Sequence, residues 1–141
     1  MKQILIVNAN YYKEITKRLV KSATNVFSRK KYNLSIITVP GVFEIPIAIR
    51  RNINKYDAFI AIGCVIKGET PHFDFICKSS FDAMMNLSIN FNKPVGNGVI
   101  TSLNIKQANE RCGKIRSKKP NKGSEAAKAV LSILNNGTKK I

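Results

Sequence analysis

The only histidine of the chain, His72, lies in a polar segment that directly follows an apolar run. The run comprises residues 58–66, and the polar segment comprises residues 67–72. A short apolar run rich in β-branched residues is typical of a strand buried on both faces of a parallel sheet. Thr70 and Pro71 suit the N-cap and the first position of a helix. The sequence therefore predicts a strand-to-helix junction beside His72, and parallel sheets bind ligands at such junctions.

The residue types at this junction favour phosphate binding and proton transfer. Gly68, Glu69 and Thr70 lead through a tight turn into the expected helix, whose free N–H groups and positive dipole end would attract a phosphate. The same residues also fit an ordinary strand-to-helix turn. The helix dipole disfavours an imidazolium at His72, so the ring would stay neutral and serve as a base. A purely structural histidine is the alternative.

Three residues from other segments suit a planar or phosphorylated ligand. Tyr11 could stack on a heterocycle or cap the core. Glu44 could receive a ring amine or cap a helix. Arg111 could pair bidentately with a phosphate or be an ordinary surface arginine. Each of these residues, taken alone, leaves both alternatives open.

Three familiar kinds of phosphate site are excluded by the sequence. The Walker A and Rossmann glycine patterns are both absent. A phosphoacceptor receiver domain needs an acidic pair after its first strand and an aspartate after its third. This chain has Asn8 and Asn10 at the first place and Lys67 at the second.

The spacing of apolar residues predicts four strands and five helices along the chain. The strands are expected at Gln3–Asn8, Leu34–Val39, Ala58–Ile66 and Pro94–Ile100. The helices are expected at Glu14–Phe27, Val42–Ile53, Phe73–Asn90, Ile105–Cys112 and Gly123–Leu134. Two glycines in the fourth strand indicate a close approach of backbones. The alternation predicts one domain over residues 1–141, an α/β protein folded as a three-layer α/β/α sandwich on a four-stranded parallel flavodoxin-like sheet.

The net charge of the chain is +16, from 24 Lys and Arg against 8 Asp and Glu. This charge is compatible with a coding bias on solvated faces, with a positive field that favours anionic substrates, and with nucleic-acid binding. The cations are spread along the chain without interleaved stacking aromatics, so we expect no nucleic-acid partner.

The sequence also predicts a cytoplasmic protein. No apolar run approaches the roughly 20 residues of a membrane span, and the start MKQILIVNAN lacks the features of a signal peptide. We therefore expect no membrane association. Cys64, Cys77 and Cys112 have no metal-ligand spacing and are expected to be reduced structural thiols.

Taken together, five motifs resemble those of the lumazine synthase family. They are VPGVFEIP (39–46), YDAFIAIGCVIKGETPHFDFIC (56–77), PVGNGVIT (94–101), QANERCG (107–113) and NKGSEAA (121–127). They occur in the family's order and cover almost the whole chain. The resemblance implies the penultimate step of riboflavin biosynthesis, a condensation of 5-amino-6-(D-ribitylamino)uracil with 3,4-dihydroxy-2-butanone 4-phosphate. The product would be 6,7-dimethyl-8-ribityllumazine, with release of phosphate and water and with no cofactor or metal.

The resemblance also implies roles for single residues. His72 matches the family's proposed proton-transfer residue, and Tyr11 takes the place of the aromatic that stacks on the pyrimidine. The remaining positions are Val42, Phe43 and Glu44 at the ribityl chain, Val65, Ile66 and Lys67 at the pyrimidinedione, Glu69, Thr70, Arg111 and Lys122 at the phosphate, and Asn97 where a neighbouring subunit covers the substrate.

Three departures from the common pattern of the family bear on these expectations. Many members have Phe at the position of Tyr11 and at the position of Asn97. The segment 113–120 is longer by a few residues than in members that form capsids, and the family's longer segments accompany pentamers. The resemblance thus implies a homopentamer whose active sites lie at subunit interfaces. A module of the same fold that binds flavin or lumazine without turnover is the alternative.

Overall fold

Four parallel strands form the centre of the structure, a computed structural model that describes all 141 residues. They are β1 (Lys2–Ala9), β2 (Tyr32–Val39), β3 (Ala58–Ile66) and β4 (Val95–Ser102), and their order across the sheet is β2-β1-β3-β4. All three pairings are parallel. The carboxyl ends of the strands therefore lie at one edge of the sheet, which we call the carboxyl edge.

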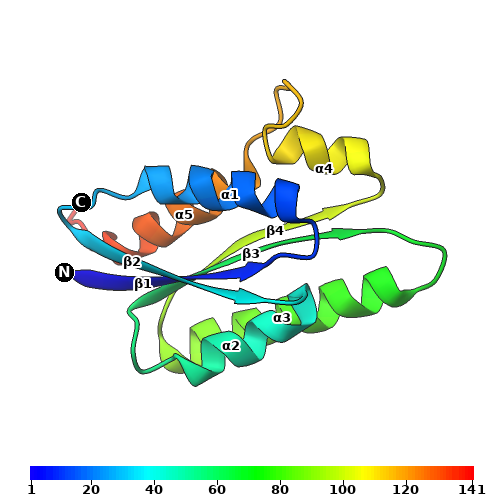
Figure 1. The fold of residues 1–141 in the computed structure, drawn as a ribbon. Helices are drawn as coiled ribbons and strands as arrows, with labels where there is room; N and C mark the ends of the chain where they lie inside the picture. Colours follow the sequence, from blue (N-terminus) through cyan, green and yellow to red (C-terminus); the bar gives the residue numbers. More distant parts are fainter.

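Helices cover both faces of the sheet (Figure 1). One face carries α1 (Lys13–Val26), α4 (Ile105–Arg111) and α5 (Lys122–Leu134), and the other carries α2 (Ile45–Arg51) and α3 (His72–Phe91). A 3₁₀ turn, η1 (Val42–Glu44), precedes α2. The expected three-layer sandwich with a flavodoxin-like sheet is confirmed. None of the helices combines the length and apolar character that a membrane span requires.

The core is divided by the sheet into two clusters because successive side chains of a strand point to opposite faces. In β1, Ile4 and Ile6 pack toward α1 and α5, whereas Leu5 and Val7 pack toward α2 and α3. The middle strand β3 is buried from Ala58 to Cys64. Its continuous apolar sequence is the pattern that two covered faces require.

The glycines of β4 allow α5 to lie directly on the sheet, as the sequence indicated. A Cβ at Gly96 would stand 2.6 Å from the carbonyl oxygen of Ala126, and a Cβ at Gly98 would stand 2.6 Å from Cδ1 of Ile62. Neither position has room for a side chain. The small residues thus set the distance between α5 and the edge strand.

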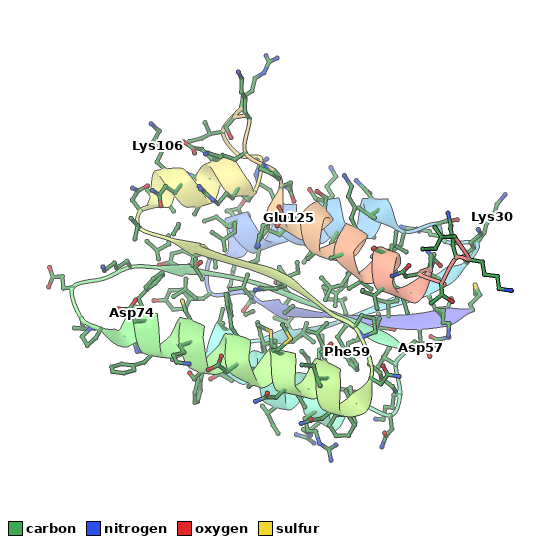
Figure 2. All side chains as sticks on the ribbon, turned by 180° about the vertical axis from the view of Figure 1, so that it is seen from behind. Lys30, Asp57, Phe59, Asp74, Lys106 and Glu125 are labelled. Carbon is green, nitrogen blue, oxygen red and sulfur yellow. The ribbon has the colours of Figure 1, made fainter.

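Polar contacts hold the opposite, amino edge of the sheet. The backbone N–H of Gln3 donates to the Asp57 carboxylate at 2.7 Å. The Lys93 ammonium donates to the carbonyl oxygens of Ile53 at 2.5 Å and of Tyr56 at 2.8 Å. Figure 2 shows Asp57 at one end of the molecule and Asp74, in the first turn of α3, at the other.

The structure differs from the sequence expectations at several element bounds, such as the start of β2 and the end of β4, and in three local features. The predicted helix 42–53 is divided into η1 and α2. Helix α3 begins at His72 with Pro71 as its N-cap, one residue later than the Thr70–Pro71 cap indicated and one residue before the expected range 73–90, and the hydroxyl of Thr70 accepts from the His72 N–H at 3.4 Å. Gly68 does not adopt a positive φ, so the turn there does not depend on glycine.

Candidate functional site

A cavity of about 520 Å³ opens at the carboxyl edge, around the end of β3. Two loops, the end of β3 and the start of α3 form its wall, and a third loop, residues 67–71, adjoins it without lining it. The lining residues are Tyr11, Tyr12, Gly41, Val42, Phe43, Glu44, Cys64, Val65, Ile66, His72 and Ile76. The structure thus brings together seven of the residues named from the sequence. The loop after β4 does not contribute, because β4 is the edge strand and its chain continues into α4 on the opposite face.

The floor of the cavity exists because β3 is longer than its pairing with β1. The β1–β3 ladder ends at Ile62, whereas β3 continues to Ile66. Residues 63–66 consequently have no strand partner on the β1 side. The backbone N–H and C=O groups of this segment that point toward the β1 side are free to bind a ligand with complementary polar edges, whereas those on the other side belong to the pairing with β4.

The first loop contributes two aromatic rings. The Tyr11 ring is 75% exposed, and its centroid lies 5.0 Å from that of Tyr12 at an interplanar angle of 76°. Tyr12 is half-buried and packs against the α1–α5 side of the core. Burial raises the pKa of the Tyr12 hydroxyl, with smaller contributions from Cys64 and Tyr11. Tyr12 therefore stays a neutral phenol, and the face of Tyr11 is open to the cavity.

The second loop, η1, places one acid beside the aromatic rings. Glu44 occupies the N-cap position of α2, but its side chain makes no capping hydrogen bond. Its backbone N–H donates to the carbonyl oxygen of Gly41 at 3.2 Å. The alternative that Glu44 merely caps a helix is therefore not supported by the geometry, and the carboxylate remains available to a ligand.

The third loop joins β3 to α3 and is exposed from Lys67 to Pro71. The backbone N–H groups of Glu69 and Thr70 donate to no group of the chain. They lie just before the N-terminus of a helix of 20 residues, where the dipole favours anions. The N–H of Lys67, by contrast, donates to the carbonyl oxygen of Ser102 at 2.9 Å. Lys67 can therefore offer a ligand its carbonyl oxygen but not its N–H.

His72 is the first residue of α3 and lines the cavity with an exposed side chain. Its ring makes no hydrogen bond within the chain, whereas its backbone N–H contacts Thr70. A histidine held for structural reasons would have a partner for its ring nitrogens. The arrangement leaves both nitrogens free for a substrate.

Six residues named from the sequence do not line this cavity. Lys67, Glu69 and Thr70 belong to the β3–α3 loop beside it, and the other three lie on β4, α4 and α5. Arg111, at the end of α4, donates to the carbonyl oxygen of Gln107 at 3.0 Å, and Lys122 lies 3.3 Å from the Glu125 carboxylate. Asn97 lies in β4 and accepts from the Val99 N–H at 3.1 Å. Helices α4 and α5 are on the opposite face of the sheet from α3, as Lys106, Glu125 and Asp74 show in Figure 2. A single chain therefore does not bring all the site residues expected from the sequence to one cavity.

Sequence reasoning missed four lining residues, Tyr12, Gly41, Cys64 and Ile76. Their positions beside the predicted loops were the only available signal. Burial raises the pKa of the Cys64 thiol to about 12, so the thiol stays protonated and is a poor nucleophile. No cluster of three His, Cys, Asp or Glu side chains is arranged to hold a metal ion.

Comparison with known proteins identifies one family. Residues 1–137 match the family model described as 6,7-dimethyl-8-ribityllumazine synthase. A protein of that name from Campylobacter jejuni subsp. doylei is 46% identical over 138 residues, which cover 94% of this chain and 88% of the relative. Proteins of the same name from Campylobacter curvus and Sulfurospirillum multivorans are 43% and 42% identical, with 94% of this chain and 86% of each relative covered.

Proposed function

This chain belongs to the 6,7-dimethyl-8-ribityllumazine synthase family of riboflavin biosynthesis enzymes, and on that premise we propose its substrates, its site residues and its assembly. The substrates are 5-amino-6-(D-ribitylamino)uracil and 3,4-dihydroxy-2-butanone 4-phosphate. The single observation that carries this proposal is the cavity at the carboxyl edge. It joins an open aromatic face, a carboxylate and a free imidazole to a loop with unpaired amides.

The heterocyclic substrate fits the inner part of the cavity. The Tyr11 ring stacks on the pyrimidine, whose polar edges meet backbone groups of Val65 and Ile66 and the carbonyl oxygen of Lys67. The ribityl chain runs along Val42, Phe43 and Glu44. This assignment is supported by the end of the β1–β3 ladder at Ile62 and by the uncommitted Glu44 carboxylate.

The phosphorylated substrate fits the outer part. The amides of Glu69 and Thr70 hold the phosphate at the start of α3, and Arg111 and Lys122 supply cations. The aromatic amine attacks the ketone to give an imine, phosphate leaves by elimination, and the ring closes with loss of water. Each step moves a proton, and His72, between the two parts, transfers it. Bringing the two substrates together supplies much of the remaining rate enhancement.

We infer that each site is shared between two subunits, because three of its expected residues lie away from the cavity of their own chain. These residues are Arg111, Lys122 and Asn97. A neighbouring copy would bring them to the cavity in a homopentamer. Large apolar side chains left in solvent support this assembly. Phe75 is 70% exposed and Ile89 is 69% exposed, both on α3. An apolar face of this kind marks a surface that another protein covers.

Activity is tested by mixing both substrates with the protein and following lumazine fluorescence. His72→Asn should lower kcat by roughly 10²-fold or more, since general acid–base catalysis contributes that much. Arg111→Ala should raise mainly the KM for the phosphorylated substrate, and Lys106→Ala, which removes an exposed cation from the same helix, is the matched control. If the wild-type protein bound lumazine tightly but made no product, the proposal of an enzyme would be wrong. The protein would then be a binding module of the same fold.

Assembly is tested by mass measurement in solution. The wild-type particle should have about five times the 15.7 kDa mass of the chain or a multiple of that value. Ile89→Asp should dissociate it and abolish activity, whereas Ile133→Asp, which changes another largely exposed isoleucine, on α5, should not. A monomeric Ile89→Asp variant with full activity would contradict shared sites.

A further inference from the structure

The aromatic ring that faces the cavity is held by very little of the chain. Tyr11 is three-quarters exposed, its hydroxyl makes no hydrogen bond, and Tyr12 provides its only aromatic contact. An exposed tyrosine with no neighbour would sample several rotamers, and binding a ligand would then cost that rotamer freedom. The orientation of the ring therefore depends on what stands beside it.

Tyr12 is well placed to be that neighbour because both its backbone and its ring are fixed. Its carbonyl oxygen accepts from the N–H groups of Ile15 at 3.1 Å and Thr16 at 3.0 Å, at the start of α1. Its ring packs against the core beneath α1 and α5 while also lining the cavity. Tyr12 thus connects the buried interior to the exposed side chain of Tyr11.

The geometry of the pair is compatible with stacking of a ligand on Tyr11. The rings meet edge to face, with centroids 5.0 Å apart at 76°. This is a favoured arrangement of two aromatic rings. Tyr12 covers at most one face of Tyr11, and the Tyr11 ring stays 75% exposed.

We propose that Tyr12 is a positioning residue, which acts through Tyr11 by holding its ring in the orientation that stacks on the heterocyclic ligand. This inference rests on the proposed function, because the ligand is the pyrimidine substrate or the lumazine product. It assigns no proton transfer to Tyr12 and requires its ring, not its hydroxyl. The specificity of the site for a flat heterocycle then depends on a residue that need not touch it.

Three variants test the proposal. Tyr12→Leu removes the aromatic ring but keeps an apolar side chain for the core, and Tyr12→Phe removes only the hydroxyl. Tyr56→Leu is the matched control, because Tyr56 forms a similar edge-to-face pair with Phe59 before β3, with centroids 6.2 Å apart at 64°. Steady-state kinetics gives kcat and a KM for each substrate, and fluorescence titration gives the Kd of 6,7-dimethyl-8-ribityllumazine.

Tyr12→Leu should raise the KM for the pyrimidine substrate and the Kd of lumazine roughly two- to tenfold, the range that one aromatic pair supports. The KM for the phosphorylated substrate and kcat should stay within about twofold, as should every parameter of Tyr12→Phe. Tyr56→Leu should lower stability without changing either KM.

Three results would overturn the proposal. The first is wild-type kinetics and lumazine binding in Tyr12→Leu. The second is an equal rise of both KM values, which general loss of structure would produce. The third is an equal effect of Tyr12→Phe, which would assign the role to the hydroxyl. Failure of the proposed function gives a different result, since wild-type protein would then make no lumazine. The Kd of lumazine would still report whether Tyr12 orients Tyr11.

Discussion

The missing side chain of Gly63 makes room for Val42, and replacing this glycine should disturb the wall of the cavity. A Cβ at Gly63 would lie 2.7 Å from Cγ2 of Val42, whereas ordinary contacts begin at 3.4 Å. Its next neighbours, Cβ of Ala9 at 3.4 Å and Cγ2 of Val99 at 3.7 Å, would be in acceptable contact. The conflict is thus confined to Val42, which is only 5% exposed and begins η1.

The size of the effect follows from two opposing terms. Overpacking a well-filled core costs about 1–3 kcal/mol, and replacing a strand glycine by alanine recovers about 0.5–1 kcal/mol of backbone entropy. Gly63→Ala should therefore lower the free energy of unfolding by up to about 2.5 kcal/mol, with a central value of about 1 kcal/mol. Urea unfolding at one fixed protein concentration measures this change as a lower midpoint with an unchanged m-value. Gly137→Ala, where a Cβ meets no atom within 4 Å, should leave the midpoint unchanged.

A double variant identifies the source of the cost. Val42→Ala removes the atom that the new Cβ would meet, so Gly63→Ala combined with Val42→Ala should be more stable than the sum of the two single losses by about 1 kcal/mol. Losses that add to within about 0.5 kcal/mol would refute the reasoning, because they would mean that β3 accommodates the methyl group by some other movement.

Three further changes test other parts of the structure. Lys93→Met should lower the free energy of unfolding by about 1–3 kcal/mol, because it leaves the carbonyl oxygens of Ile53 and Tyr56 without their donor; thermal unfolding measures it. The free energy of unfolding should fall as the pH rises from about 9 toward 12, because the unfolded Cys64 thiol ionises near its ordinary pKa of 9.0 while the folded thiol, with a pKa of about 12, keeps its proton. Cys64→Ala should remove this contribution, and an unchanged slope would assign it elsewhere. Gly68→Ala should not lower the midpoint of urea unfolding, because a Cβ there meets no atom within 4 Å and the backbone has no positive φ.

Elements with a strong local pattern were predictable from the sequence. The bounds of β3 agree at both ends because its apolar run stops abruptly at the polar segment. The periodicity that predicted one helix over 42–53 could not separate a 3₁₀ turn from an α-helix, since both repeat every three to four residues. The start of α3 moved by one residue because a threonine–proline pair fits two neighbouring registers of a cap.

The site was predictable only where chain order determines position. Loops that follow parallel strands share one edge, which placed Tyr11, Glu44 and His72 together before any geometry was known. Chain order does not reveal which face of the sheet a following helix covers, and so the separation of Arg111 from His72 was not foreseen. The sequence did not reveal that Tyr12 lines the cavity. Its contact with the Tyr11 ring depends on side-chain packing, which the order of residues does not determine.

The packing of α5 also constrains how the chain folds. The hydroxyl of Tyr32, at the start of β2, bonds the side chain of Asn135, 103 residues later. Gly123, buried at the start of α5, lies against the backbone of Leu19 in α1. One whole face of the sheet is closed only when α5 returns to α1, and contacts of such long range slow folding. During synthesis the ribosome would therefore release a chain with an uncovered apolar sheet face, a species suited to chaperone binding, until α5 docks.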